Sequence, residues 1–355
     1  MTAKESPVRT AVIGSGWWAN YAHLPGLAKN PRAEIAVVHS RTLDKAKRSA
    51  GRFGCERFTD SVEEALDTPG LRAAVIASTP NVHIEQVLAA FRRGLHVLVE
   101  KPLVLSFRDA LTIQSEASRQ GLHVVMSCPF QFNEHTAELR RRLACAQAGP
   151  LRLVHMLMTN YVRAISDPSR GEVFLPGMEF AERPNATSYS DPAIAGGGFS
   201  FNQFPHALGW LFHVTADVPI GVSAQFEKAG APVELFASLS MRLHGGAIVT
   251  LAGVGNPPQS HRPFEVRFFF EHAAAFLDLM NGLAEWLPNE GEREPWATLE
   301  RGDFYPIGAP VDALIELALG GHENPAPLPP AVQAIRVIEA AQQSARDGGR
   351  WVSLP

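Results

Sequence analysis

Short apolar runs alternate with amphipathic segments through the first third of the chain. Each apolar run has hydrophobic residues at consecutive positions, which is typical of strands buried on both faces of a parallel sheet. The predicted strands are RTAVI (9–13), EIAVVHS (34–40), RAAVIAST (72–79), LHVLVE (95–100) and LHVVMS (122–127). Because helical patterns separate them, the sequence predicts a right-handed, doubly wound Rossmann domain over residues 1–128.

Local signals mark where the helices of this domain begin and end. Gly54, Gly94 and Gly121 end three of the helical patterns, and Ser61 begins another as one half of a capping box. Pro25 removes a backbone donor inside the first helical pattern, so we expect that helix to be kinked or split.

The pattern changes after about residue 130. Residues 133–149 are expected to form a helix, and the last helix is expected over 331–345, after a stiff Pro-rich link at 324–330. The segments between them are longer and rich in β-formers: 151–162, 220–228, 233–243, 247–254 and 264–270, with a hairpin turn at His244-Gly245-Gly246. Residues 129–355 are therefore predicted to form an α/β substrate-binding and oligomerisation domain with a large, mainly antiparallel open sheet. The aperiodic segment 163–195 is expected to be either a functional loop or disordered.

Composition excludes several classes of function. Hydrophobic residues make up 46% of the 355 residues and charged residues 19%, with a net charge of −4 and no long basic run. This argues against nucleic-acid and anionic-membrane partners, which need clustered Lys and Arg. Three scattered cysteines and the lack of a long apolar span favour a cytoplasmic protein. No pair of the thirteen histidines has a ligand spacing with supporting acids, so no metal site is expected.

The turn after the first strand carries a dinucleotide pattern. GSGWWA places Gly14, Gly16 and Ala19 at GxGxxA spacing between a strand and a helix. The pattern alone is weak, because tight strand-to-helix turns use glycine anyway, but its place in a βαβ run favours a cofactor site. Trp17 and Trp18 either shield the cofactor or fill the seam between the domains.

The end of the second strand bears on the choice of cofactor. His39-Ser40-Arg41-Thr42 has no carboxylate for the ribose 2′-hydroxyl of NAD, whereas Ser40 and Arg41 suit a 2′-phosphate. NADP(H) is therefore favoured and NAD(H) is possible. The alternative is that Arg41 is a solvated loop residue.

Lys101 follows the strand of residues 95–100 directly. Ligands of open α/β sheets lie beyond the carboxyl ends of the strands, and Pro102 disfavours helical geometry at Lys101. An ammonium group there can bond a substrate hydroxyl or carbonyl and exchange a proton with it. The alternative is a lysine that simply extends to water.

Residues 75–106 strongly resemble the Gfo/Idh/MocA (glucose–fructose oxidoreductase / inositol dehydrogenase) family of NAD(P)-dependent oxidoreductases. The matching signature is Thr79-Pro80-Asn81, His83, Gly94, His96-Val97-Leu98-Val99 and Glu100-Lys101-Pro102. The resemblance implies that Lys101 contacts nicotinamide and substrate, with Glu100 as its partner. It places Thr79, Pro80, Asn81 and His83 on the cofactor side, and Gln131 where many members have an arginine near the nicotinamide. It also implies a homodimer or homotetramer.

The resemblance extends to a glycine run followed by an Asp-xxx-His element. Here Gly196-Gly197-Gly198 precede Asn202 and His206, whose i, i+4 spacing predicts one shared helical face. Asn202 replaces the family's usual Asp and cannot accept a proton at neutral pH, so proton handling is expected of His206 or Lys101. The family's Trp-Arg-x-Asp-Pro is reduced to Ser188-Tyr189-Ser190-Asp191-Pro192.

These features predict an NAD(P)-dependent dehydrogenase or reductase acting on CH–OH groups of a sugar, sugar derivative or cyclitol. Lys101, His206 and Asn202 are the expected catalytic residues. The alternative, raised by Asn202, is a catalytically silent NAD(P)-binding sensor or regulatory protein on the same fold. Retention of both Lys101 and His206 argues against it.

Overall fold

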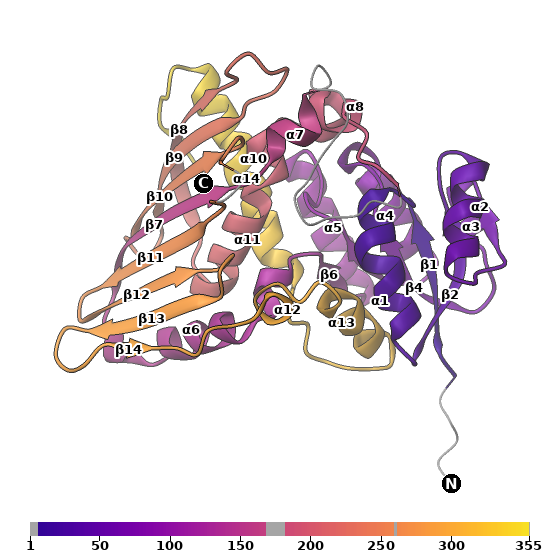
Figure 1. The fold of residues 1–355 in the computed structure, drawn as a ribbon, viewed down its shortest axis with the longest axis horizontal. Coiled ribbons are helices and arrows are strands. Elements are labelled where there is room, and N and C mark those ends of the chain that lie inside the picture. Colours follow the sequence, from indigo (N-terminus) through magenta and orange to yellow (C-terminus); the bar gives the residue numbers. More distant parts are fainter. Residues whose placement is uncertain (1–5, 168–181, 259–260, 355) are drawn as a thin grey trace, which may run out of the picture.

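A six-stranded parallel sheet forms one side of the computed structural model, which describes residues 6–167, 182–258 and 261–354 (Figure 1). Its strand order, β3-β2-β1-β4-β5-β6, is that of a doubly wound sheet, so the predicted Rossmann domain is confirmed. The strands are β1 (Val8–Ile13), β2 (Ala33–His39), β3 (Phe58–Thr59), β4 (Leu71–Ile76), β5 (His96–Val99) and β6 (Val124–Met126). The two-residue β3 was not predicted from the sequence.

Helices cover both faces of this sheet. Right-handed crossovers place α1 (Leu24–Lys29) and α2 (Leu43–Arg52) on one face. They place α3 (Val62–Leu66), α4 (His83–Phe91) and α5 (Phe107–Gln120) on the other. The split near Pro25 is confirmed, because a π-helical turn, Ala19–His23, precedes α1.

The capping box at the start of α3 is only half formed. Ser61 Oγ accepts from Glu64 N–H at 3.2 Å as predicted. The Glu64 carboxylate, however, accepts from the Thr59 hydroxyl instead of the Ser61 backbone, whose N–H donates to that same hydroxyl. Thr59 of the neighbouring strand β3 therefore donates the hydrogen bond that the Ser61 backbone would donate to Glu64 in a complete capping box.

The second unit is built on a nine-stranded sheet of order β14-β13-β12-β11-β7-β10-β9-β8-β15. Only β10 and β7 pair in parallel, so the mainly antiparallel sheet is confirmed. The strands are β7 (Leu151–Thr159), β8 (Pro219–Glu227), β9 (Phe236–Leu243), β10 (Ile248–Val254), β11 (Phe264–Phe270), β12 (Ala273–Asp278), β13 (Leu283–Pro288), β14 (Glu294–Pro295) and β15 (Val352–Ser353). The last four were missed, since β12 begins with three alanines and β14 and β15 are two residues long.

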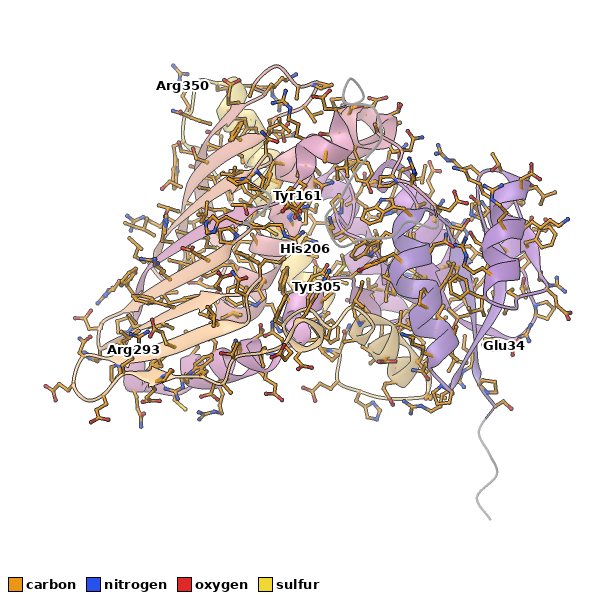
Figure 2. The ribbon with its side chains drawn as sticks, viewed as in Figure 1. Glu34, Tyr161, His206, Arg293, Tyr305 and Arg350 are labelled. Carbon is orange, nitrogen blue, oxygen red and sulfur yellow. The ribbon has the colours of Figure 1, made fainter. Side chains whose placement is uncertain are left out.

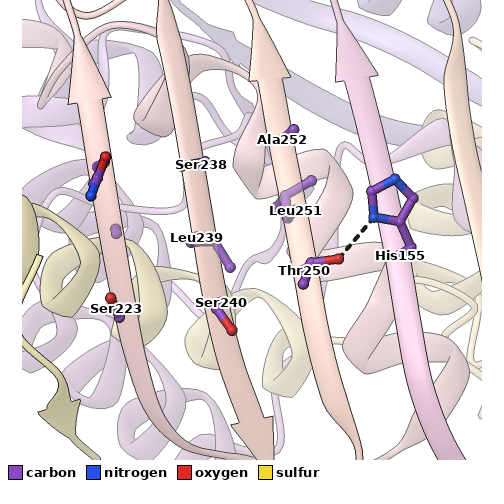
Figure 3. A pocket seen from close by; sticks show the side chains of 10 residues that line it. His155, Ser223, Ser238, Leu239, Ser240, Thr250, Leu251 and Ala252 are labelled. Carbon is purple, nitrogen blue, oxygen red and sulfur yellow. Dashed lines mark hydrogen bonds between the residues drawn. The ribbon is translucent and has the colours of Figure 1, made fainter.

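One face of this sheet is covered by helices and the other is open. The covering layer comprises α6 (Glu134–Ala144), α11 (Phe204–Thr215) and α14 (Leu328–Arg346) (Figure 1). The open face carries small polar side chains around His155 and Thr250 and has a shallow depression of ≈ 370 Å³ (Figure 3). The predicted Pro-rich link at 324–330 is partly wrong, because α14 begins at Leu328 and takes Pro329 and Pro330 into its first turn.

The segment 163–195 is less irregular than expected. Its described flanks form α7 (Val162–Ser166), α8 (Thr187–Ser190) and α9 (Pro192–Ala195), and residues 168–181 lie outside the described residues. Four-residue helices such as α8 and α9 are too short to show a helical period in the sequence.

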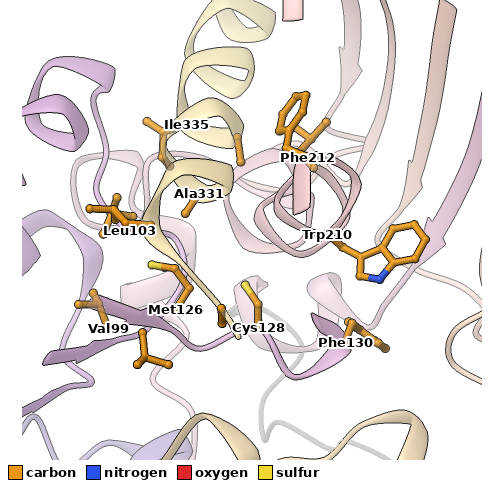
Figure 4. Packing of buried hydrophobic residues seen from close by; sticks show 14 of the residues in the cluster. Val99, Leu103, Met126, Cys128, Phe130, Trp210, Phe212, Ala331 and Ile335 are labelled. Carbon is orange, nitrogen blue, oxygen red and sulfur yellow. The ribbon is translucent and has the colours of Figure 1, made fainter. Parts of the chain in front are cut away.

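Late parts of the chain return to the Rossmann sheet. After the short α12 (Arg301–Phe304), helix α13 (Ala309–Ala318) packs on β4, β5 and β6, and Met126 N–H donates to Ala326 O at 2.9 Å. A shared apolar core joins the two units, with Val99 and Met126 from one side and Trp210 and Ile335 from the other (Figure 4). The expected boundary between residues 128 and 129 stays a prediction. No helix among the described residues is long and apolar enough to cross a membrane.

A buried histidine is expected to make stability fall in mild acid. Burial lowers the pKa of His213 in α11 from 6.5 to about 4. The unfolded chain therefore binds more protons than the native state between these values, and stability falls as pH falls through that window. From pH 7.5 to pH 5 this site should cost about 2 kcal/mol of unfolding free energy.

The variant His213→Gln tests this in urea unfolding at the two pH values. Its loss of stability on acidification should be smaller than that of the parent by about 2 kcal/mol. His155→Gln, a change at an exposed histidine on the open face, is the matched control and should leave the parent's loss unaltered. Equal losses in the parent and His213→Gln would contradict the assignment.

Candidate active site

The turn after β1 has the features that a dinucleotide pyrophosphate requires. Gly14 has φ +94°, and a Cβ built there would lie 2.7 Å from Ser78 N, so both its conformation and its packing require glycine. A Cβ at Gly16, in contrast, would meet nothing within 4 Å. Ser15 Oγ is buried at this turn and has no hydrogen-bond partner among the described residues. A site with open space and an unused hydroxyl beside a glycine turn fits a phosphate-bearing ligand.

The two tryptophans of this turn lie at the junction of the units. Their rings meet edge to face with centroids 5.1 Å apart, and both are half-buried. Trp17 Nε1 donates to Tyr189 Oη at 2.7 Å, which links the turn to α8. Burial raises the pKa of Tyr189 to about 12, so its phenol stays protonated. Both roles expected for these residues, shielding and seam filling, are compatible with this position.

Ser40 and Arg41 follow directly after β2. Ser40 is buried and its N–H donates to Thr59 O at 3.2 Å, whereas Arg41 is exposed. Within the described ranges, Arg41 makes no hydrogen bond or ion pair.

His83 contacts the backbone of the two segments that border Lys101 and the Thr79-Pro80-Asn81 turn. It is fully buried at the start of α4, with Nδ1 3.1 Å from the carbonyl oxygens of both Pro102 and Leu103 and Nε2 3.1 Å from Ser78 O. Burial lowers the pKa of His83, which keeps it neutral. Its ring lies between the segment after Lys101 and the segment before the Pro80–Val82 turn, and the single N–H of the neutral imidazole donates to one of the two. In that turn Thr79 and Pro80 are half-buried and Asn81 is exposed, at the carboxyl end of β4.

Glu100 is a buried carboxylate at the end of β5. His23 Nε2 lies 2.7 Å from Glu100 Oε1, and Lys101 N–H donates to Oε2 at 3.2 Å. Burial alone would raise the pKa of Glu100, but hydrogen bonds from His23 and Ser127 and the charge of Lys101 outweigh it and lower the pKa. Glu100 therefore stays ionised and anchors the backbone of Lys101 to the turn that follows β1.

Lys101 points across the junction between the units. The Lys101–Pro102 peptide bond is cis, and Lys101 Nζ donates to the backbone oxygen of Asn202 at 2.7 Å. Burial lowers the pKa of Lys101, with Glu100 opposing part of the shift. The side chain is thus fixed in direction and gives up its proton more readily than an exposed lysine does.

The predicted helical face shared by Asn202 and His206 is wrong. Asn202 ends α10 (Phe199–Asn202), and α11 starts at Phe204, with Gln203 between the two helices. Pro205 has no N–H to continue the helix, and this explains the break. As a result Asn202 offers its backbone oxygen to Lys101, while its side-chain oxygen accepts from Gln203, whose own amide oxygen accepts from Asn160 at 2.8 Å.

His206 is nevertheless close to Lys101. It is 7% exposed, its ring meets Phe130 edge to face at 5.9 Å, and its Nδ1 has no partner among the described residues. Burial, followed by the positive charge of Lys101, holds the pKa of His206 well below 6.5. Gln131 lies under α11, where its amide donates to Gly209 O at 3.1 Å and its Oε1 is unpartnered.

Glu234 was missed by the sequence analysis. This buried residue precedes β9, and its backbone oxygen accepts from Phe199 N–H at 2.8 Å. Its carboxylate accepts from the N–H and hydroxyl of Ser200. A Cβ at Gly198 would lie 2.0 Å from Glu234 O, so the glycine run allows this close approach. Glu234 therefore fixes α10, and with it the oxygen that binds Lys101.

The structure brings together most of the predicted site. Lys101, His206 and Asn202 meet at the junction, and the glycine turn and the Thr79–Asn81 turn lie at carboxyl ends of neighbouring strands. Arg41 and Gln131 make no contact with the Lys101 side chain. His23 and Glu234 are additional residues of the site, and no local sequence pattern marked them.

These features define a class: a Rossmann dinucleotide-binding unit with a lysine at a strand end facing a second, open-sheet unit. A family model described as "Oxidoreductase family, NAD-binding Rossmann fold" (GFO_IDH_MocA) matches residues 8–127. The resemblance is thereby confirmed over the Rossmann unit, which is similar to the Gfo/Idh/MocA oxidoreductases.

Individual relatives agree with the family match. Over 146 residues (41% of this chain) the chain is 27% identical to scyllo-inositol 2-dehydrogenase (NAD(+)) of Bacillus subtilis (strain 168). Over 146 residues it is 30% identical to dTDP-3,4-didehydro-2,6-dideoxy-alpha-D-glucose 3-reductase of Saccharopolyspora spinosa, again covering 41% of this chain. The matches span 42% and 44% of these curated relatives.

The whole fold is shared with solved structures. GenD2 from gentamicin A biosynthesis, in complex with NAD, has a TM-score of 0.81 at 22% identity, covering 100% of this chain and 98% of GenD2. At this level of identity the likeness shows the fold.

A methyl group added at Gly16 tests whether the turn after β1 binds the dinucleotide. Gly16→Ala should weaken dinucleotide binding by at least about tenfold, because the methyl group would occupy the space left for the pyrophosphate. Its free energy of unfolding should change by less than about 0.5 kcal/mol, since the space is empty in the protein itself.

Gly51→Ala is the matched control. Gly51 lies in α2, and a Cβ there also meets nothing within 4 Å. This variant should keep dinucleotide affinity and gain about 0.4–1 kcal/mol of stability. Fluorescence titration and urea unfolding give the two quantities. Unchanged affinity in Gly16→Ala would place the dinucleotide elsewhere.

Proposed function

We propose that this protein is an NAD(P)-dependent oxidoreductase acting on a hydroxyl or carbonyl carbon of a sugar, sugar derivative or cyclitol. The observation that carries the proposal is the hydrogen bond from Lys101 Nζ to Asn202 O, beside His206 and at the same sheet edge as a glycine dinucleotide turn. A sensor would need the turn but not a desolvated lysine facing a neutral histidine. The names of the relatives, which are dehydrogenases and reductases, support the enzyme over the silent alternative.

The residues that would hold the dinucleotide follow from the geometry of the turn. Gly14 and Gly16 allow backbone N–H groups to reach a pyrophosphate, and Trp17 and Trp18 flank it. The Thr79-Pro80-Asn81 turn borders the nicotinamide end, with Glu100 and His83 fixing that edge from below. When bound, the nicotinamide supplies or accepts the hydride.

Lys101 and His206 divide the handling of the substrate oxygen. Because burial lowers the pKa of Lys101, its amine can accept the proton of a substrate hydroxyl during oxidation and return it during reduction. His206 stays neutral beside the ammonium, so it serves as a hydrogen-bond partner that orients the substrate oxygen. Asn202 fixes the direction of Lys101 through its backbone oxygen, which an Asp at this position would do equally well.

NADP(H) remains the favoured cofactor because of Arg41. Its guanidinium is exposed and unpaired among the residues described, at the strand end where a 2′-phosphate is expected. NAD(H) is the alternative, and the named relatives that specify a cofactor specify NAD.

The open face of the nine-stranded sheet is the surface we assign to self-association in a homodimer or homotetramer. Its side chains around Ser223, Ser240 and Thr250 are small and polar, which suits close packing of a second sheet.

Replacing Lys101 should separate chemistry from cofactor binding. Lys101→Met should lower kcat by about 10²–10⁴-fold, because a general acid/base contributes that much, and leave the dinucleotide Kd nearly unchanged. Steady-state kinetics and fluorescence titration measure the two. Lys101→Arg should be as inactive, since a guanidinium does not release its proton.

The pH profile provides a control on which residue titrates. The acid limb of kcat for alcohol oxidation should persist in His206→Gln, because His206 is neutral throughout the working range. A limb that disappears in His206→Gln but survives in Lys101→Met would reverse the two roles. Tight dinucleotide binding with no turnover of any sugar or cyclitol by the parent would support the sensor.

Replacing Arg41 tests the cofactor. Arg41→Ala should raise the Kd of NADPH by about 10- to 100-fold through loss of a charged hydrogen bond, and should change that of NADH by less than about threefold. Lys45→Ala, which removes an exposed charge one turn into α2, is the control and should alter neither. Quenching of tryptophan emission gives both constants. A parent that prefers NADH would contradict the assignment of Arg41.

A further inference from the structure

Arg262 is a partly buried cation with no anion. It lies in the connection between β10 and β11, and its Cζ is 5.5 Å from the ring centroid of Tyr161. It makes no hydrogen bond or ion pair with the described part of the chain. Arg142 and Arg163, which are also half-buried, are each paired with a carboxylate.

The groups around Arg262 connect it to His206 of the candidate active site. The groups that act on it most strongly are the phenols of Tyr161, Tyr305 and Tyr21 and the cation of Arg301, with no carboxylate among them. The Tyr305 ring packs edge to face on Phe130 with centroids 4.8 Å apart, and Phe130 contacts His206 in turn. Tyr161, His206 and Tyr305 lie one below another in the space between the nine-stranded sheet and the Rossmann unit (Figure 2).

An unpaired guanidinium in such a place is costly. Removal of a charge from water without a partner destabilises the fold, and burial lowers the pKa of Arg262 accordingly. The Tyr305 phenol supplies a hydroxyl group that donates a hydrogen bond to an anion as the guanidinium does. Glu100 is the carboxylate that acts on Tyr305, but its two oxygens are already bound to His23 and to the Lys101 backbone. Among the described residues, Arg262 therefore has no anionic partner of its own.

We propose that Arg262, with the hydroxyl of Tyr305, binds a carboxylate of the substrate, so that the substrate is a sugar acid. This inference rests on the proposed oxidoreductase function and names the substrate class of that same site. A single guanidinium fork matches a carboxylate in bidentate geometry. A phosphate dianion or diphosphate would require further cations, and the other cation near Arg262, Arg301, is exposed.

The experiment compares each sugar acid with its neutral counterpart. Glucuronate is paired with glucose and galacturonate with galactose, and glucose 6-phosphate tests the phosphate alternative. The parent should show kcat/KM for an acid at least about 100-fold above its neutral counterpart, the scale of a charged hydrogen-bonded pair. Arg262→Gln should lower kcat/KM for the acid by about 10²–10³-fold and that for the neutral sugar by less than about threefold.

Two further measurements distinguish a substrate contact from a structural or long-range role. Arg301→Gln, the matched control, removes a neighbouring exposed charge and should change kcat/KM for the acid by less than about threefold. The melting temperature of Arg262→Gln should be unchanged or higher, because the variant removes an unpaired buried charge. Equal losses for acid and neutral sugars, equal effects of both arginine changes, or preference for glucose 6-phosphate would overturn the inference.

Calorimetric titration of each acid into the dinucleotide-saturated protein separates this inference from the proposed function. Binding of an acid that depends on Arg262, without turnover, would support the carboxylate site and count against the oxidoreductase. Efficient turnover of neutral sugars with no advantage for acids would support the oxidoreductase and count against the carboxylate site. Absence of both acid binding and acid turnover would overturn the carboxylate site.

Discussion

The hydrogen bond from Lys101 Nζ to the backbone oxygen of Asn202 is the interaction on which the site depends. It joins a strand end of the parallel sheet to the second unit, and both of its ends are held independently. Glu100 and His23 fix the backbone of Lys101, and Glu234 fixes the short helix that ends at Asn202. Because neither end can move without breaking buried polar contacts, Lys101 keeps its direction before any ligand arrives.

The charges around Lys101 and His206 disfavour protonation of both side chains at the same time. Lys101 and His206 are close enough that protonation of both is unfavourable, and burial disfavours the charged form of each. Glu100 stays ionised beneath them and restores part of the affinity of Lys101 for its proton. The lysine to which we assign proton exchange thus lies next to a histidine whose pKa is held well below 6.5. Arg262, over the Tyr161 ring, adds a further positive group to the second unit.

The parallel sheet could be predicted because its signals are local. Strands such as β4 and β5 contain runs of consecutive apolar residues that follow a glycine, and Ser106 and Gly121 cap α5 as their residue types predict. The strands β12 to β15 lack such signals, because the pairing partner supplies the order that an alanine-rich or two-residue segment does not. The shared helix for Asn202 and His206 was a wrong extrapolation of spacing, since Pro205 breaks the hydrogen-bond ladder between them.

The sequence by itself determined the Rossmann fold, the glycine turn and the place of Lys101 at a strand end, since each is written in neighbouring residues. Only the tertiary structure decided which groups surround Lys101. His23, Asn202 and Glu234 come from three distant segments, and their pairing depends on burial and on long-range chain crossings. Local patterns encode backbone preference and polarity, but the pKa of a group and the partner of a charge are properties of its three-dimensional surroundings.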